Sequence, residues 1–253
     1  MTAKTALGAV LVVIAVSLAG GGFYAAKSFG PAKLDPETLC PAEGAKTVTL
    51  ILVDKTDPLS LEEQGLARRI VGAERDAARR GDRIVVDLLT QGGGSPPVSL
   101  ATAADLCNPG SEANPFFENP KRVAARYESA FLERIDAALA SVGDEARAPE
   151  SPIARSIELA LESLRAPPGA RVKLILVSDL MEHGAKVSAY SAALSDKALR
   201  GLVSPRAAPL LKGAQVKIAL LPRPKFEAQQ KAALMAWRAF FLVMTGEAAS
   251  ILP

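Results

Sequence analysis

Oxygen-bearing side chains gather at three points of the sequence, each beside a stretch expected to be a strand or a helix start. They are Asp54, Thr56, Asp57 and Ser60 after one expected strand, Ser178, Asp179 and Glu182 after another, and Ser151 at a helix start. Carboxylate and hydroxyl oxygens, completed by water, are the ligands that Mg²⁺ prefers, and Mn²⁺ accepts the same donors. If the fold brings the three points together, the sequence predicts a site for Mg²⁺ or Mn²⁺.

The pattern of apolar residues predicts an α/β fold that would bring them together. Short runs rich in β-branched residues indicate buried strands, and they span residues 47–53, 83–89, 172–177 and 216–221. Apolar residues at helical spacing indicate helices, and they span residues 61–80, 121–141, 152–164 and 226–244. This alternation favours an open, mostly parallel sheet with helices on both faces. Ligands of such sheets bind outside the carboxyl ends of the strands, where Asp54 and Asp179 are expected.

Two helix starts carry recognisable capping signals. Ser60 followed three residues later by Glu63 matches a capping box, in which each side chain bonds the backbone N–H of the other residue. Ser151 is expected to cap the helix that begins with Pro152, because proline is favoured at the first helical position. Both serines therefore belong to the predicted rim of the sheet.

The N-terminus predicts attachment to a membrane. Residues 6–26 are uncharged and strongly apolar, which is long enough for a transmembrane helix. The same segment also resembles a cleavable signal peptide. The Phe23–Tyr24 pair, however, is suited to a membrane interface, which favours a retained anchor. The expected organisation is an anchor or signal over residues 1–26, a Pro/Gly linker over residues 27–46 and one domain over residues 47–253.

The two cysteines bear on which side of the membrane the domain lies. Cys40 falls in the predicted linker and Cys107 in a predicted loop, an even count in a chain with an export-like start. We expect a Cys40–Cys107 disulfide and hence a single-pass membrane protein with its domain on the periplasmic or extracytoplasmic side. The alternative is two free thiols that face the cytoplasm.

The charge distribution argues against a nucleic-acid partner. The chain of 253 residues carries 30 basic and 27 acidic residues, for a formal net charge of +3. These charges are interspersed along the sequence and create no concentrated field that would attract a polyanion.

At the oxygen-bearing positions the chain resembles the von Willebrand factor type A (VWA) domains, over essentially everything after residue 46. That family carries a metal-ion-dependent adhesion site: an Asp-x-Ser-x-Ser loop after the first strand, a later threonine and a second aspartate. Asp54 matches the first aspartate and Thr56 the first serine position, while Ser151 and Asp179 resemble the threonine and the last aspartate. Pro58 stands at the second serine position and offers no side-chain oxygen.

The resemblance implies a binding function rather than catalysis. A VWA domain binds a protein partner whose acidic group completes the coordination of the metal, so we expect a membrane-anchored protein-interaction module. Because of Pro58, the adhesion site is degenerate unless Asp57 or Ser60 supplies the missing oxygen.

A haloacid-dehalogenase-like phosphatase is the alternative of a different class. Such enzymes also begin with an apolar strand that ends in an aspartate, here Asp54, and a later strand ends in a hydroxyl residue, here Ser178. Their acid/base position is Thr56 in this chain, and no later strand ends in paired carboxylates. The single histidine, His183, gives little support to serine or cysteine hydrolysis. We therefore assign no catalytic residue.

Overall fold

The central feature of the protein is a six-stranded, mostly parallel sheet. The computed structural model describes residues 14–17, 20–21, 24, 33–92, 98–140 and 148–253. The sheet has the order β3-β2-β1-β4-β5-β6, and β3 is its antiparallel member. The strands are β1 (Thr47–Asp54), β2 (Arg83–Gln91), β3 (Val98–Cys107), β4 (Arg171–Ser178), β5 (Gln215–Leu220) and β6 (Ser250–Ile251). The predicted α/β class with a mostly parallel sheet is confirmed.

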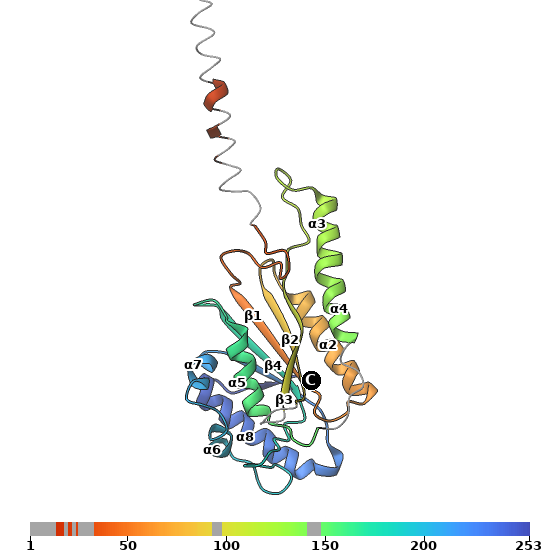
Figure 1. Cartoon of the computed structure of the whole chain (residues 1–253), viewed down its shortest axis with the longest axis vertical. Helices are drawn as coiled ribbons and strands as arrows, with labels where there is room; N and C mark the ends of the chain where they lie inside the picture. The colour runs from red at the N-terminus through yellow and green to blue at the C-terminus, as the bar shows by residue number, and fades with distance from the viewer. Residues whose placement is uncertain (1–13, 18–19, 22–23, 25–32, 93–97, 141–147) are drawn as a thin grey trace, which may run out of the picture.

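Helices cover both faces of this sheet, as Figure 1 shows. One face carries α5 (Ile153–Leu164), α6 (Asp196–Arg200), α7 (Ala207–Leu211) and α8 (Glu227–Thr245), the last preceded by the 3₁₀ turn η2 (Pro224–Phe226). The other carries α2 (Leu61–Ala77) and the continuous helical stretch α3 (Pro120–Arg126), η1 (Tyr127–Leu132) and α4 (Glu133–Ala140). The η1 segment is a π-helical turn within a helix that the sequence predicted as regular.

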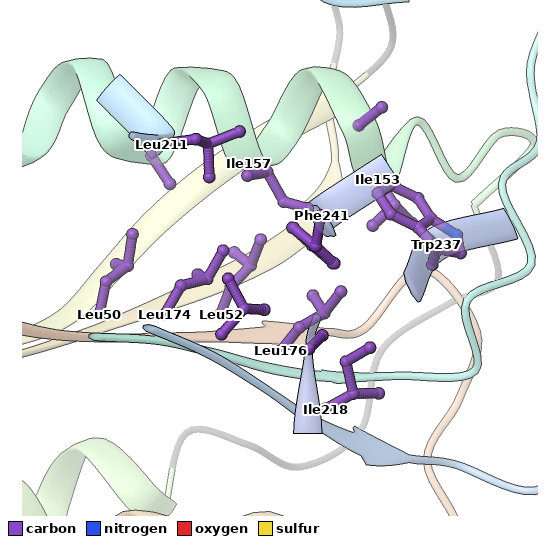
Figure 2. Packing of buried hydrophobic residues seen from close by; sticks show 14 of the residues in the cluster. Leu50, Leu52, Ile153, Ile157, Leu174, Leu176, Leu211, Ile218, Trp237 and Phe241 are labelled. Atoms are coloured by element: carbon purple, nitrogen blue, oxygen red, sulfur yellow. The ribbon is translucent and has the colours of Figure 1, made fainter. Parts of the chain in front are cut away.

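Alternate side chains along the strands pack into two separate hydrophobic cores, one on each face of the sheet. On β1, Leu50 and Leu52 point to the α5/α8 face, whereas Ile51 and Val53 point to the α2/α4 face. Figure 2 shows the first core, in which strand residues such as Leu52 lie beneath residues of α5 and α8. Trp237 is among the fully buried side chains there. Burial on both faces explains why these strands read as continuous apolar runs.

Two strands were not predicted from the sequence. The segment before residue 107 was predicted as a long loop, but it forms β3 and pairs with β2 in antiparallel register from Gln91–Val98 to Arg83–Cys107. Its alanines, serine and threonine give a weak strand pattern, because β3 is an edge strand with part of its surface exposed. β6 is only two residues long and carries too little pattern to detect.

The helix starts gave one confirmed and one wrong prediction. Ser60 caps α2: its Oγ accepts from the backbone N of Glu63, and Glu63 accepts from the backbone N of Ser60. Ser151, in contrast, is not the cap of α5, because Pro152 occupies that position and the helix begins at Ile153. Ser151 instead pairs with His183 through both backbone groups, which leaves its hydroxyl for the rim.

The predicted disulfide is present and joins the segment before β1 to the end of β3. Cys40 bonds Cys107, the last residue of β3, and no described cysteine is free. The backbone N of Cys107 also donates to the carbonyl of Thr38 over 2.8 Å. Leu39, which lies between Thr38 and Cys40, is buried. Residues 33–46 therefore pack on the domain.

Among the helices that the structure describes, none combines the length and the apolar character that a membrane span needs. The predicted anchor over residues 6–26 lies largely outside those residues.

Candidate functional site

The candidate site lies where β1 and β4 end side by side. Asp54 is the last residue of β1 and Ser178 the last residue of β4, and the two strands are direct neighbours. Asp179 follows immediately. All three side chains are buried, with Asp54 5% and Asp179 4% exposed. The topology thus places both predicted aspartates at one rim of the sheet.

Asp54 is the acceptor at the centre of the site. Its Oδ1 accepts from the backbone N of Thr56 at 3.1 Å and from the Thr56 hydroxyl at 2.6 Å. Its Oδ2 accepts from the Ser178 hydroxyl at 2.8 Å. These bonds fix the carboxylate rigidly and compensate for its removal from water.

Ser151 completes the cluster from a distant part of the chain. Its Oγ lies 2.9 Å from Oγ1 of Thr56 and 3.5 Å from Oδ2 of Asp54. Three of the four predicted ligand positions, Asp54, Thr56 and Ser151, therefore meet. The antiparallel bridge between Ser151 and His183 is what holds the third oxygen against the β4 end of the rim.

Asp179 is engaged differently, by a basic side chain that follows β5. Its Oδ2 accepts from Nε of Arg223 at 2.7 Å, and Nη1 of the same guanidinium pairs with Glu63 at the start of α2. Burial, followed by the nearby charge of Asp54, raises the pKa of Asp179 to about 6, while Arg223 opposes the rise. Arg223 thus supplies a positive charge inside the acidic rim.

The turn after Asp179 is strained and firmly held. Leu180 has a positive φ of 63°, a conformation that costs a non-glycine residue about 1–2 kcal/mol. Its side chain is fully buried, and its carbonyl accepts from the Trp237 indole at 3.1 Å. Gln230 donates to the carbonyl of Asp179 at 3.0 Å. Helix α8 therefore sets the direction in which Asp179 points.

Glu182 lies at the end of this turn and joins it to α5. Its Oε2 accepts from the backbone N of Ala154, in the first turn of α5, at 2.9 Å. Burial raises the pKa of Glu182 to about 8, with the charge of Asp54 acting in the same direction. Burial therefore favours the protonated form of Glu182.

A cavity of about 1010 Å³ opens over the cluster. Thr56, Ser151 and Arg223 are among the residues that line it, whereas Asp54 and Asp179 lie behind them and are not part of the lining. Much of its wall is rigid or aromatic, formed by Pro58, Pro149, Tyr190, Pro222, Pro224, Phe226 and Pro253. A mostly apolar pocket with a few convergent polar groups is typical of a binding site.

The donor set fits a divalent cation only in part. Asp57 and Pro58 line the cavity, and the oxygen of Ser60 is used by the helix cap. Asp179 already has one oxygen bonded to Arg223. Within the described residues no group of three or more acidic, histidine or cysteine side chains is arranged to hold a metal. Asp54, Thr56 and Ser151 remain as the oxygen donors that suit Mg²⁺ or Mn²⁺.

Comparison with known proteins places this architecture among distant structural neighbours. No family model and no curated protein matches the chain. Similar solved structures include the conserved hypothetical protein BatB from Bacteroides thetaiotaomicron, 17% identical with a TM-score of 0.41 over 71% of this chain and 68% of that one. Human COPII-coat protein Sec24c is 13% identical with a TM-score of 0.44, over 83% of this chain and 29% of that one. An aerotolerance-related membrane protein from Bacteroides fragilis, a variant with multiple mutations to serine, is 13% identical with a TM-score of 0.35, over 82% of this chain and 92% of that one. Similarities this distant assign neither a family nor a function.

Sequence reasoning missed Arg223 and Glu63 as residues of the rim. Arg223 stands between Pro222 and Pro224, directly after a predicted strand. Its position past a strand end was the available signal, because β5 ends at the same edge as β1 and β4. Glu63 was assigned only to the capping box, and its second role depends on tertiary contact with Arg223.

Proposed function

We propose that the chain is a membrane-tethered, VWA-type interaction module that binds a protein partner at the rim of its sheet. The observation that carries the proposal is the convergence of Asp54, Thr56 and Ser151 beneath the cavity. Residues from separate parts of the sequence are fixed there by hydrogen bonds, as expected of a preorganised recognition site.

The topology supports the same edge of the sheet. Strand order β3-β2-β1-β4-β5 reverses its direction of growth at β1 and β4, and ligands of doubly wound sheets bind at such switch points, outside the carboxyl ends of the strands. The resemblance of Asp54, Thr56, Ser151 and Asp179 to the VWA pattern points to these same positions.

The wall of the cavity suits a peptide segment of a partner. Prolines and aromatic rings present apolar surface at a small cost in conformational entropy, which favours binding. The side chain of Phe226 packs edge-on against Tyr190, with ring centroids 4.9 Å apart. Charged residues of both signs, Glu150 and Lys225 among them, also line the cavity, so polar contacts can fix the register of the segment.

Mg²⁺ or Mn²⁺ at this rim remains a prediction. Asp54, Thr56 and Ser151 would hold the ion, and water would supply further ligands. A bound divalent ion would present a positive charge to an acidic group of the partner. Asp179 would join the ligands only through Oδ1, which already accepts from the backbone N of Met181 at 2.9 Å, because Arg223 holds Oδ2.

The geometry favours a phosphatase less than a binding module. Ser178 does lie against Asp54, as a dehalogenase-like site requires. The acid/base position of such an enzyme, however, is Thr56, whose hydroxyl donates to Asp54 at 2.6 Å. Nδ1 of His183 is likewise engaged, 2.9 Å from the hydroxyl of Ser188.

An extracytoplasmic location is part of the proposal. A structural disulfide persists in oxidising compartments and is rare in the cytosol. The apolar segment over residues 6–26 would tether the domain to the membrane from that side. An extracytoplasmic partner is therefore expected.

Site-specific photocrosslinking in the native membrane tests the proposal. A photoreactive residue at Pro58, which is exposed and lines the cavity, should capture a defined protein. The matched control at Met235 on the outer face of α8, 67% exposed, should not capture it.

A double variant tests whether crosslinking at position 58 depends on the hydrogen-bonded cluster around Asp54. The double variant Thr56→Ala, Ser151→Ala should lose the product at position 58 while it retains the thermal stability of a folded domain. Equal capture from positions 58 and 235, or full capture in the double variant, would contradict the proposal.

A further inference from the structure

The loop that follows β3 lies at one end of the strands, and the cavity lies at the other end. Cys107 ends β3 beside Arg83, the first residue of β2, and Arg83 in turn pairs with Val48 near the start of β1. The loop over residues 108–119 therefore lies where β1 and β2 begin. The rim at Asp54 is at the other end of the same strands.

The described domain also starts at this end. Residues 33–46 precede β1. The Cys40–Cys107 bond ties them to Cys107, the residue directly before the loop. Figure 1 shows the start of α3, the loop before it and the segment before β1 at one end of the molecule. Whatever tethers the chain through its N-terminus must therefore approach the domain from this end.

Internal hydrogen bonds give the loop a defined shape. Asn108 donates to the carbonyl of Ala78 at 2.8 Å and accepts from the backbone N of Gly110 at 2.7 Å. Glu118 accepts from the backbone N of Asn114 at 2.9 Å and pairs with Arg80 at 3.1 Å. The loop is thus built to hold a particular surface.

That surface is aromatic and exposed. Phe116 is 87% and Phe117 39% exposed, with ring centroids 6.5 Å apart. The backbone N of Phe116 donates to the side chain of Asn114 at 2.9 Å, which orients the tip of the loop. Two adjacent phenylalanines held outward by such bonds suggest a surface that is covered in the working protein.

Two basic residues follow the phenylalanines in the sequence. Lys121 and Arg122 are exposed in the first turn of α3, whereas the nearby carboxylate of Glu118 is paired with Arg80 and Arg126. Over residues 108–122 these two exposed basic side chains stand against one exposed carboxylate, Glu112. Exposed aromatic rings together with a surplus of basic side chains match the interface of a phospholipid bilayer, where rings enter the headgroup layer and cations meet phosphates.

The length of the intervening chain places a bilayer within reach. Residues 27–32 separate the apolar segment over residues 6–26 from the described domain. Even fully extended, the seven steps from residue 26 to residue 33 span at most roughly 25 Å. A surface tethered so closely meets the membrane at a high effective concentration, so a weak intrinsic affinity is enough for contact.

We propose that Phe116 and Phe117 dock on the bilayer that carries the N-terminal segment. The occupant of this surface is the phospholipid interface itself. Docking would fix the orientation of the domain, because the cavity over Asp54 lies at the opposite end and would face away from the membrane. The inference rests on the membrane tether of the proposed function, and it is independent of what the cavity binds.

Depth-dependent fluorescence quenching tests the docking. The full chain, with residues 1–26 retained as verified by mass, is reconstituted in nanodiscs of phosphatidylcholine with a minority of phosphatidylglycerol. Phe116→Trp is compared with Leu61→Trp, because Leu61 is 86% exposed at the rim edge. Trp237 is fully buried and provides a common background in both variants.

Docking predicts that brominated lipid quenches the Phe116→Trp emission, with a blue shift, and leaves Leu61→Trp unaffected. Adding Phe117→Ser and reversing Lys121 and Arg122 to glutamate should reduce the quenching at least severalfold without changing the unfolding temperature. Equal quenching of the two tryptophans would overturn the proposal. A blue shift at position 116 without lipid quenching, which would indicate a protein partner or a second copy, would overturn it as well.

Discussion

The guanidinium of Arg223 donates from Nε to Oδ2 of Asp179 over 2.7 Å and reaches Glu63 with Nη1. One side chain thereby links the turn after β4 to the first turn of α2. The side chain of Arg223 is only 18% exposed, and those of its partners less. A positive charge in this position neutralises part of the rim that the sequence predicts as a metal site.

Removal of this guanidinium should destabilise the domain. Arg223→Gln leaves Asp179 and Glu63 without their shared cation, which for a largely buried pair costs roughly 3 kcal/mol of unfolding free energy. Chemical denaturation measures the loss. Arg223→Lys, which keeps the charge but not the forked donors, should lose less. A change below about 0.5 kcal/mol in the glutamine variant would place the pair among ordinary surface ion pairs.

The same substitution should strengthen divalent-metal binding. Without Arg223 the negative potential at Asp54 and Asp179 is no longer offset, so Mn²⁺ should bind Arg223→Gln at least about tenfold more tightly than wild type. Calorimetric titration with Mn²⁺ and Mg²⁺ gives the affinities. Adding Asp54→Asn should abolish the heat. Equal affinity with and without Arg223 would show that this side chain does not oppose the metal.

Loss of the disulfide should weaken the domain strongly. The Cys40–Cys107 bond spans a sequence separation of 67 residues, and loop-closure entropy for such a length corresponds to roughly 4 kcal/mol. The double variant Cys40→Ser, Cys107→Ser should therefore unfold at markedly lower denaturant concentration than oxidised wild type. Reduced wild type is the control and should match the variant. Coincident curves for the oxidised and reduced wild-type protein would count against this role.

Glu182 should make stability fall as pH rises. Its pKa is raised from 4.5 to about 8 by burial, so between these values the native state keeps a proton that the unfolded chain releases. Glu182→Gln retains an acceptor for Ala154 and removes this penalty. The variant should be more heat-stable than wild type at pH 8, with the difference vanishing towards pH 4.5.

The matched control for that measurement is Glu62→Gln, at an exposed position in α2. It should leave the pH profile of the unfolding temperature unchanged. A constant offset between Glu182→Gln and wild type across the pH range would argue against a proton held in the native state.

The sequence predicted the parts of the fold whose signals are local. β1, β2, β4 and β5 are recognisable because burial on both faces demands continuous apolar runs. β3 is not, because its stability comes from pairing with β2 rather than from its own small side chains. The capping box at Ser60 was readable because both its members lie within one helical turn.

The site was predictable to a similar extent. Asp54 ends β1, and Thr56 and Asp179 follow the ends of β1 and β4, so the topology alone brings them near one another. The position of Ser151 was expected from a helix cap, yet it results from backbone pairing with His183. The contact of Arg223 with Asp179 was out of reach, because it joins side chains whose proximity only the assembled sheet determines.

The central position of β1 has a consequence for the order in which the chain is made. Its neighbours are β2, which follows shortly, and β4, which comes only after α5. A chain that leaves the ribosome or the export channel N-terminus first can join β1, β2 and β3 and close the Cys40–Cys107 bond before β4 has emerged. Throughout that interval one edge of β1 has unpaired backbone N–H and C=O groups, the kind of edge that invites aggregation. The Cys40–Cys107 bond, formed early, would hold β1, β2 and β3 together until β4 and the strands after it are added.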